Sequence, residues 1–315
     1  MRLLLSLLVF LAFAVQAQKQ IVITIDDLPT VSKAYATPEG RLNLTKKLLS
    51  HCTAFQVPAI GFVIGNSLRT NSKPDSNQIG LLKLWLNAGL ELGNHTLAHK
   101  DYNNISFEGS KADIIGGESI VKNLVQQRER PFRYFRHPYL RKGDTQAKKD
   151  SLEQFLKQRG YQEAPVTIDN SDWLFSRAYD NALLLSDTAL AAQVGKQYVT
   201  YMLNCAAYYE AQSDSLFNRQ ISQILLIHAN TINADFLGKL LAGLKQHGYT
   251  FVSLDKALTD TAYRSVDHYY GKGGISWLHR WALTLGKKGA FFKGEPEVPA
   301  MVDELANRTV NLPGR

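Results

Sequence analysis

Short apolar runs, each ending abruptly at a polar side chain, most constrain what this chain can fold into. The run from Ile21 to Ile25 ends at Asp26 and Asp27. The strand predicted over residues 221–227 ends in the apolar run from Ile224 to Ile227, which His228 follows. Continuous apolar runs are typical of strands buried on both faces of a parallel sheet. We therefore expect the polar residues to meet at the edge where parallel strands end.

Helical patterns alternate with these and other apolar runs. Helices are predicted over residues 39–55, 79–88, 112–128, 144–158, 177–218 and 234–247, and further strands over 59–64, 90–93, 132–135, 163–168 and 250–253. Strands that alternate with helices predict an α/β fold with a parallel sheet and helices outside it. The number of βα units favours closure into a barrel over a small open sheet.

The N-terminus has the pattern of a secretory signal peptide over residues 1–17. Arg2 precedes an apolar stretch from Leu3 to Val15, and Val15, Gln16 and Ala17 form a small-x-small cleavage pattern. The stretch is too short for a typical membrane span, although a retained N-terminal anchor is the alternative. We expect an exported protein, periplasmic or secreted after cleavage near Ala17, with no transmembrane segment in the mature chain.

Charge and cysteine content add weaker constraints. The formal net charge of +8 is dispersed, which is compatible with weak association with anionic surfaces. The chain carries no nucleic-acid-binding motif, so no nucleic-acid partner is expected. Export would permit a disulfide between Cys52 and Cys205, but two buried thiols are an equal alternative.

Adjacent carboxylates at the end of a buried strand suit a two-part catalytic task. Side chains of neighbouring strand residues point to opposite sides, so Asp26 and Asp27 are expected to diverge. One carboxylate can then bind a metal while the other accepts a proton. The alternative interpretation is a pair of turn or helix-cap residues.

Two histidines follow the strand predicted over residues 90–93. His95 and His99 are four residues apart, so on a helix they would share one face and chelate one ion. A zincin-type metalloprotease would carry Glu directly after the first His, but Thr96 stands there. Asp26 is then the candidate base. His228 is placed for proton transfer, although a lone His beside apolar residues is often a core residue.

Five motifs occur in order over residues 20–256. They are Thr24-Ile25-Asp26-Asp27, His95-Thr96-Leu97-Ala98-His99, Arg136-His137-Pro138-Tyr139, Asp169-Asn170-Ser171-Asp172-Trp173 and Leu226-Ile227-His228. Together they resemble the motifs of the polysaccharide deacetylases, the carbohydrate esterase family 4 group with the NodB homology domain. One departure is Leu140, which follows Tyr139 where many members carry Gly.

The resemblance implies a deformed (β/α) barrel of the NodB type, with a catalytic domain over residues 20–258 and a C-terminal extension over 259–315. The extension breaks the strand–helix rhythm with glycines and an aromatic-basic stretch, and we expect it to pack on the barrel or on a surface. The resemblance also implies one divalent metal, most often zinc, with cobalt, nickel or manganese as alternatives. The implied metal ligands are Asp27, His95 and His99.

The resemblance implies further roles for single residues. Asp26 would be the base that deprotonates water, and His228 the acid that protonates the leaving group. Arg136 would pair with a carboxylate, while Asp169 or Asp172 would support His228 or Arg136. Substrate and oxyanion contacts would come from Pro138, the backbone N–H of Tyr139, and Trp173.

The implied reaction is removal of acetyl groups from a carbohydrate polymer or oligosaccharide. N-deacetylation of an N-acetylglucosamine polymer, such as peptidoglycan or a chitin-like chain, is the first expectation. An O-acetyl esterase acting on xylan or another glycan is the second. A non-catalytic wall-binding protein on the same fold, and more remotely a metalloprotease, are alternatives of other classes.

Overall fold

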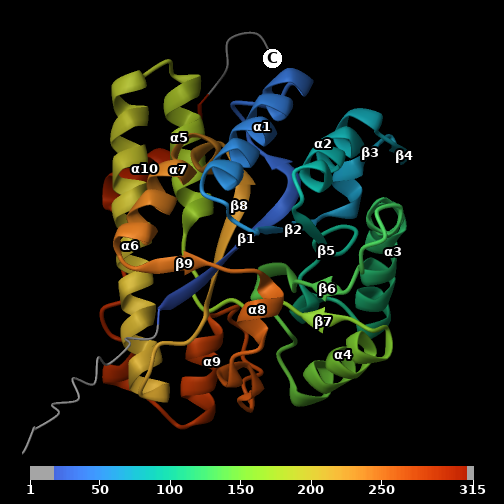
Figure 1. Cartoon of the computed structure of the whole chain (residues 1–315), viewed down its shortest axis with the longest axis vertical. Coiled ribbons are helices and arrows are strands. Elements are labelled where there is room, and N and C mark those ends of the chain that lie inside the picture. The colour runs from blue at the N-terminus through green and yellow to red at the C-terminus, as the bar shows by residue number, and fades with distance from the viewer. Residues whose placement is uncertain (1–17, 311–315) are drawn as a thin grey trace, which may run out of the picture.

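The computed structural model describes residues 18–310 and centres on a curled parallel sheet (Figure 1). Its seven strands are β1 (Lys19–Val31), β2 (Ile60–Val63), β5 (Glu91–Asn94), β6 (Tyr134–Phe135), β7 (Gln162–Glu163), β8 (Gln223–Asn230) and β9 (Tyr249–Phe251). The order is β7-β6-β5-β2-β1-β8, with β9 paired to the start of β1, and every pairing is parallel. The short strands β3 (Arg69–Thr70) and β4 (Lys73–Pro74) form a separate antiparallel pair.

The segment after β7 bends the sheet toward closure. Strand β7 (Gln162–Glu163), which pairs with β6, overlaps the strand predicted over residues 163–168 only at Glu163, and a single bridge joins Ile168 to Leu225 of β8. Pro165 lies between these contacts, and proline cannot donate a ladder hydrogen bond. The sheet thus curls into a deformed half-barrel, which confirms the predicted fold class.

Within residues 18–310, ten α-helices surround the sheet. They are α1 (Pro38–Ala54), α2 (Ser76–Asn87), α3 (Phe107–Gln126), α4 (Gln146–Gln158), α5 (Asp172–Leu184), α6 (Thr188–Phe217), α7 (Thr231–Gln246), α8 (Leu254–Leu258), α9 (Trp277–Thr284) and α10 (Ala300–Asn307). Short 3-10 helices cover Gly65–Leu68, Tyr102–Asn104, Pro138–Leu140, Thr261–Arg264 and Gly289–Phe292. Each predicted helix is present, and the long pattern over 177–218 divides into α5 and α6.

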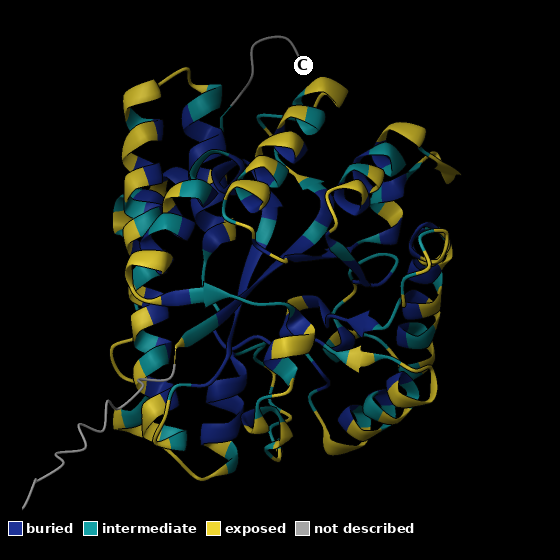
Figure 2. Cartoon of the chain, in the orientation of Figure 1, coloured by how far each residue is buried: buried dark blue, intermediate teal, exposed yellow. Residues whose placement is uncertain are grey.

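Side-chain caps fix where several helices begin. Thr37, Asp75, Ser106 and Thr145 each accept a hydrogen bond from a backbone N–H in the first turn of the following helix. These contacts satisfy donors that have no partner within the helix. Figure 2 shows the strands buried in the centre, while exposed residues lie on the outward faces of the helices.

The C-terminal extension contacts the rest of the structure at several points. The amide of Asn181 on α5 donates to the carbonyls of Leu305 and Arg308, at 2.8 and 3.0 Å. The hydroxyl of Ser276 donates to the carbonyl of Thr167 at 2.7 Å. None of the helices within residues 18–310 combines the length and apolarity that a membrane span requires. The predicted signal peptide, residues 1–17, lies outside the described residues.

Both cysteines are buried free thiols. Cys52 lies on α1 and Cys205 on α6, and each side chain belongs to the hydrophobic core. Burial raises the pKa of each thiol to about 12. They therefore serve as small core residues, in line with the second of the two alternatives left open by the sequence.

Candidate active site

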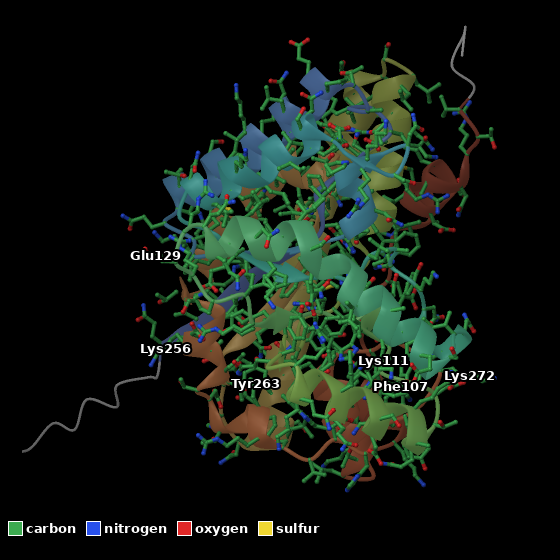
Figure 3. The ribbon with its side chains drawn as sticks, turned by 90° about the vertical axis from the view of Figure 1, so that its right-hand side faces the viewer. Phe107, Lys111, Glu129, Lys256, Tyr263 and Lys272 are labelled. Atoms are coloured by element: carbon green, nitrogen blue, oxygen red, sulfur yellow. The ribbon has the colours of Figure 1, made fainter. Side chains whose placement is uncertain are left out.

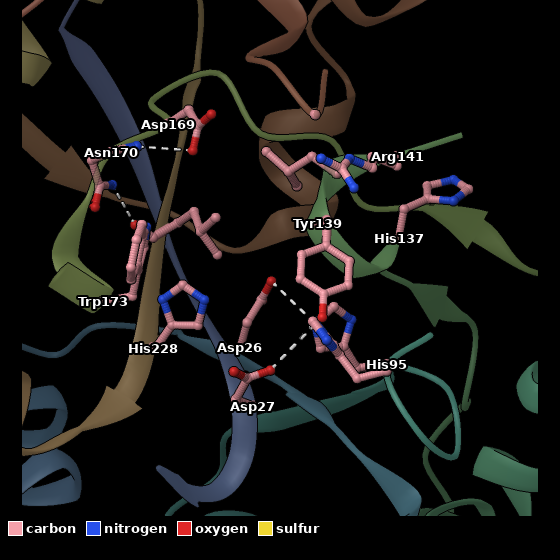
Figure 4. A pocket seen from close by; sticks show the side chains of 14 residues that line it. Asp26, Asp27, His95, His137, Tyr139, Arg141, Asp169, Asn170, Trp173 and His228 are labelled. Atoms are coloured by element: carbon pink, nitrogen blue, oxygen red, sulfur yellow. Dashed lines mark hydrogen bonds and ion pairs between the residues drawn. The ribbon is translucent and has the colours of Figure 1, made fainter. Parts of the chain in front are cut away.

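Asp26 and Asp27 lie within β1 rather than at its end. The strand continues to Val31, and its pairing register shifts between Ile25 and Leu28. Asp27 has a left-handed backbone with φ of 62°, a conformation that Asp tolerates better than most residues. Because of this irregularity, both carboxylates face the same cavity (Figure 4), so the expectation that they diverge is wrong.

His95 and His99 lie on a loop, so the predicted helical placement is also wrong. Thr96 and His99 have φ of 66° and 51°, which no α-helix contains. Hydrogen bonds within the loop and to α3 fix this path. Oδ1 of Asn94 accepts from the backbone N–H of Thr96, and Oγ1 of Thr96 accepts from the backbone N–H of His99. Oδ1 of Asp113 on α3 accepts from the backbone N–H of Ala98. The loop still brings the two imidazole rings together, with centroids 4.7 Å apart.

Asp27, His95 and His99 converge on one point. Oδ1 of Asp27 lies 3.6 Å from Nε2 of His95 and 3.7 Å from Nε2 of His99. Tetrahedral zinc with bonds of about 2.0–2.2 Å holds its ligand atoms about 3.4 Å apart. Oδ1 of Asp27 is buried without a hydrogen-bond partner in the described part of the chain. Oδ1 of Asp27 and the Nε2 atoms of His95 and His99 therefore have the spacing that a divalent metal requires, and the Asp27 oxygen has lone pairs available to bind it.

The protonation states of the histidines suit metal binding. Burial lowers the pKa of His95 to about 4. Burial and the neighbouring His95 lower the pKa of His99 to about 4. Nδ1 of His95 lies 2.9 Å from the carbonyl oxygen of Arg136, so Nδ1 is the protonated nitrogen and Nε2 keeps its lone pair. Neutral imidazoles with an available Nε2 are the form that binds a metal.

Arg136 lies beneath the cavity and contacts Asp26. Its guanidinium is fully buried, with Nη1 3.4 Å from Oδ2 of Asp26 and Nη2 donating to Thr24 Oγ1 at 2.9 Å. Burial raises the pKa of Asp26 to about 6, and the charge of Arg136 limits that rise. Oδ1 of Asp26 has no hydrogen-bond partner among the described residues, so it is available to a proton donor.

His228 pairs with Asp172 across the cavity from His95. Nδ1 of His228 lies 2.6 Å from Oδ1 of Asp172. The carboxylate also accepts from the His228 backbone N–H, Asn230 and Asn233, at 2.8, 3.0 and 2.8 Å. Burial alone would lower the pKa of His228, but the carboxylates of Asp172, Asp27 and Asp26 together outweigh it and raise that pKa to about 10. This pKa favours the cationic form of His228 at neutral pH.

Asp169 forms no hydrogen bond or ion pair with His228 or Arg136, the two partners that the resemblance implied, in the described part of the chain. Its Oδ1 accepts from the backbone N–H of Asn170 at 2.9 Å, and its contribution to Arg136 is a longer-range charge effect. Burial raises the pKa of Asp169 to about 7. Asp172 thus supports His228 and Asp26 pairs with Arg136, while Asp169 lines the cavity wall.

The cavity has a volume of about 620 Å³ and is lined by residues of all five motifs, by Leu140 and Arg141, and by Gly274. Tyr139 and Trp173 stand at its mouth, 54% and 48% exposed, whereas Pro138 is buried. Two partly exposed aromatic side chains beside polar groups suit the faces and hydroxyls of a sugar. His137 points away from the other labelled residues (Figure 4) and contacts Glu163.

Gly274 and Arg141 are lining residues that the sequence patterns missed. Arg141 follows the third motif by two residues, whereas Gly274 comes from a distant part of the chain. This glycine lies within the stretch of Gly271, Gly273 and Gly274, which interrupts the strand–helix rhythm. That interruption was the one available signal, but it does not indicate a contact with a motif more than a hundred residues earlier.

The chain is similar in sequence to known proteins over its N-terminal half and beyond. The family model described as polysaccharide deacetylase matches residues 14–163. A 30.6 kDa uncharacterized protein from Geobacillus stearothermophilus is 28% identical over 223 residues, which span 70% of this chain and 68% of that protein.

Solved structures share the fold. A family 4 carbohydrate esterase pseudoenzyme from Bacillus anthracis has a TM-score of 0.52 and 15% identity, covering 77% of this chain and 66% of that one. PdaA of Bacillus subtilis, a family 4 carbohydrate esterase, has a TM-score of 0.50 and 20% identity, covering 77% and 81%. A mutant of the peptidoglycan deacetylase PdaC of Bacillus subtilis has a TM-score of 0.50 and 18% identity, covering 77% and 93%. The match to the polysaccharide deacetylase model and the fold shared with family 4 carbohydrate esterases confirm the resemblance indicated by the five sequence motifs.

Proposed function

We propose that this protein is a metal-dependent hydrolase that removes acetyl groups from a carbohydrate. The substrate class we favour is N-acetylglucosamine-containing polysaccharide. One observation carries the proposal. A carboxylate with an available oxygen, Asp26, and a cationic imidazole, His228, share a cavity with the Asp27, His95 and His99 cluster. Amide or ester hydrolysis needs a base before the tetrahedral intermediate and an acid after it.

One divalent ion would be held by Asp27, His95 and His99. Zinc is the ion we favour, and cobalt, nickel and manganese are alternatives. Such an ion lowers the pKa of its water and polarises the acetyl carbonyl. With three ligands from the protein, the ion would remain able to act on both water and substrate. His95 keeps the required tautomer because its other nitrogen is bonded to the Arg136 carbonyl.

Asp26 takes the proton from the attacking water. Its carboxylate is ionised at neutral pH, and a pKa of about 6 makes it a stronger base than an exposed Asp. The buried guanidinium of Arg136 keeps this carboxylate charged and fixes its orientation. A base whose pKa lies near the working pH combines the correct charge with useful basicity.

His228 donates a proton to the departing amine or alkoxide. Asp172 holds the ring through Nδ1 and keeps it charged, so Nε2 carries the proton to be delivered. The base and the acid thus have pKa values well apart, about 6 and about 10. The backbone N–H of Tyr139, which follows Pro138, would stabilise the oxyanion.

Fold alone does not support activity, because a pseudoenzyme shares this fold. The residues of the cavity therefore carry the proposal. Tyr139 and Trp173 at the cavity mouth favour a sugar ring. The PdaC relative is a peptidoglycan deacetylase, and the signal-peptide pattern of residues 1–17 would export this chain to the compartment that holds such polymers.

Acetate release from a small glycan panel tests the proposal. The zinc-loaded protein is incubated with N-acetyl chitooligosaccharides, peptidoglycan and acetylated xylan. Release from the first two supports the proposed substrate class. Release from acetylated xylan alone favours the O-acetyl esterase. If no glycan yields acetate while zinc is bound, the non-catalytic alternative is favoured instead.

A further inference from the structure

Two consecutive residues of the active-site loop have an unusual backbone. Tyr139 and Leu140 have φ of 56° and 55°, the left-handed region that disfavours residues with a side chain. A residue in this region is strained and persists only where its surroundings hold it. Some contact must therefore stabilise this turn, which carries the N–H expected to face the oxyanion.

The C-terminal extension supplies that contact. Gly274 lies so close to the turn that a Cβ added to it would lie 1.6 Å from the carbonyl oxygen of Tyr139 and 3.3 Å from Cβ of Leu140. Leu140 is buried, only 5% exposed. The backbone at Gly274 thus packs directly against the turn, and no residue with a side chain fits at this position without a shift of its neighbours.

Hydrogen bonds hold this glycine-rich loop in place. The amide of Asn103 donates to the carbonyl of Lys272 at 3.0 Å, just before α3. Figure 3 shows Lys272 beside the end of α3 that carries Phe107 and Lys111. Ser276 and Trp277 bond to the carbonyls of Thr167 and Val166, each at 2.7 Å.

A buried charge network also joins the extension to the loop. Nζ of Lys142 lies 2.8 Å from Glu163 and 3.6 Å from Asp267, and Lys142 is only 3% exposed. Asp267 in turn accepts from Nε of Arg280 at 2.9 Å. Glu163 also lies 2.7 Å from Nε2 of His137, so residues on both sides of the turn are anchored.

We infer that residues 267–280 are a positioning element of the active site, which holds the Tyr139–Leu140 turn in its left-handed conformation. The inference rests on the proposed function only for the role of the Tyr139 N–H. It assigns a role to the C-terminal extension and explains how the turn forms with Leu at position 140. Within the described residues, the hydrogen bonds and ion pairs of this element involve none of Asp27, His95 and His99, so disturbing the element should leave metal affinity largely unchanged.

Gly274→Ala is the direct test, with Gly273→Ala as its matched control. An added Cβ at Gly273 meets nothing closer than 3.3 Å, the hydroxyl of Tyr269. Asp267→Asn is a second route, because it removes the charge shared by Lys142 and Arg280 without adding bulk. The readouts are hydrogen exchange of amides 139–142, kcat and KM for acetate release, and zinc affinity by calorimetry.

Gly274→Ala and Asp267→Asn should speed exchange at residues 139–142 by about fivefold or more while peptides of β1 stay protected. Their kcat should fall about tenfold or more, with KM and zinc affinity within about twofold of the wild type. Gly273→Ala should match the wild type throughout. The inference would be overturned if amides 139–142 exchanged at the wild-type rate in both Gly274→Ala and Asp267→Asn. It would also be overturned if Gly273→Ala changed exchange and kcat as much as Gly274→Ala does. If the wild type releases no acetate at all, the proposed function fails, while the exchange readout still decides the inference.

Discussion

Nδ1 of His228 lies 2.6 Å from Oδ1 of Asp172, the first residue of α5. Asp172, together with Asp27 and Asp26, raises the pKa of His228 against the effect of burial. An acid catalyst works only while it is protonated, so activity should be lost as pH rises through the pKa of His228. We expect this alkaline limb near pH 10 in the wild type.

Asp172→Asn should move the alkaline limb to lower pH. Without the carboxylate, burial disfavours the imidazolium, so the pKa of His228 falls and the acid form is lost earlier. The pH profile of kcat/KM measures the shift. Asp180→Asn is the control, because Asp180 is a buried carboxylate on the same helix that contacts Ser32 and Lys33. An unchanged limb in Asp172→Asn would contradict the assignment of His228 as the acid.

Asp26→Asn should separate catalysis from metal binding. The amide keeps the shape of the side chain but cannot accept the proton of water, so kcat should fall about a hundred- to ten-thousandfold. Zinc affinity, measured by calorimetry, should change little because Asp26 is outside the implied ligand set. Turnover that survives this substitution would show that another group is the base.

His99→Gln should weaken the metal site. Removing one of three protein ligands should reduce zinc affinity by more than about a hundredfold, as judged from the effects of changes next to ligands. Zinc that binds only the folded protein raises Tm, and this rise should disappear in the variant. His268→Gln, at an exposed position of the extension, should behave like the wild type. An equal zinc-induced rise in His99→Gln would place the metal elsewhere.

Gly117→Ala should disturb the histidine loop from behind. A Cβ at Gly117 on α3 would lie 2.6 Å from Oδ1 of Asn94 and from the carbonyl carbon of Thr96. Such overpacking costs about 1–3 kcal/mol and should also lower zinc affinity, since the loop carries His95 and His99. The control is Gly80→Ala on α2, where nothing lies within 4 Å and alanine should stabilise the helix by about 1 kcal/mol. Melting curves with and without zinc compare the two, and equal stability would count against this packing.

The sequence predicted the sheet, the order of its helices and the residues that meet at its edge. Buried parallel strands have a strong local signature, and their ends point to one rim whatever the detailed geometry. The strands predicted over residues 21–25 and 221–227 pointed in this way to Asp26, Asp27 and His228. The roles of the other site residues came from the motif resemblance and remain predictions.

Other features depend on contacts that local patterns do not contain. The shared orientation of Asp26 and Asp27 follows from a left-handed residue within a strand, and the approach of His95 to His99 from a loop bonded to α3. Periodicity rules assume regular backbone, so both predictions failed at these irregular positions. The contact of Gly274 with Tyr139 depends on the tertiary fold alone.

Zinc titration of metal-free protein, with acetate release from N-acetyl chitooligosaccharide as the signal, tests the central claim most directly. The proposed chemistry predicts no release without metal, a linear rise up to one equivalent of zinc, and a plateau beyond it. Acetate release that is independent of added metal, or zinc that binds at one equivalent without any release, would contradict it.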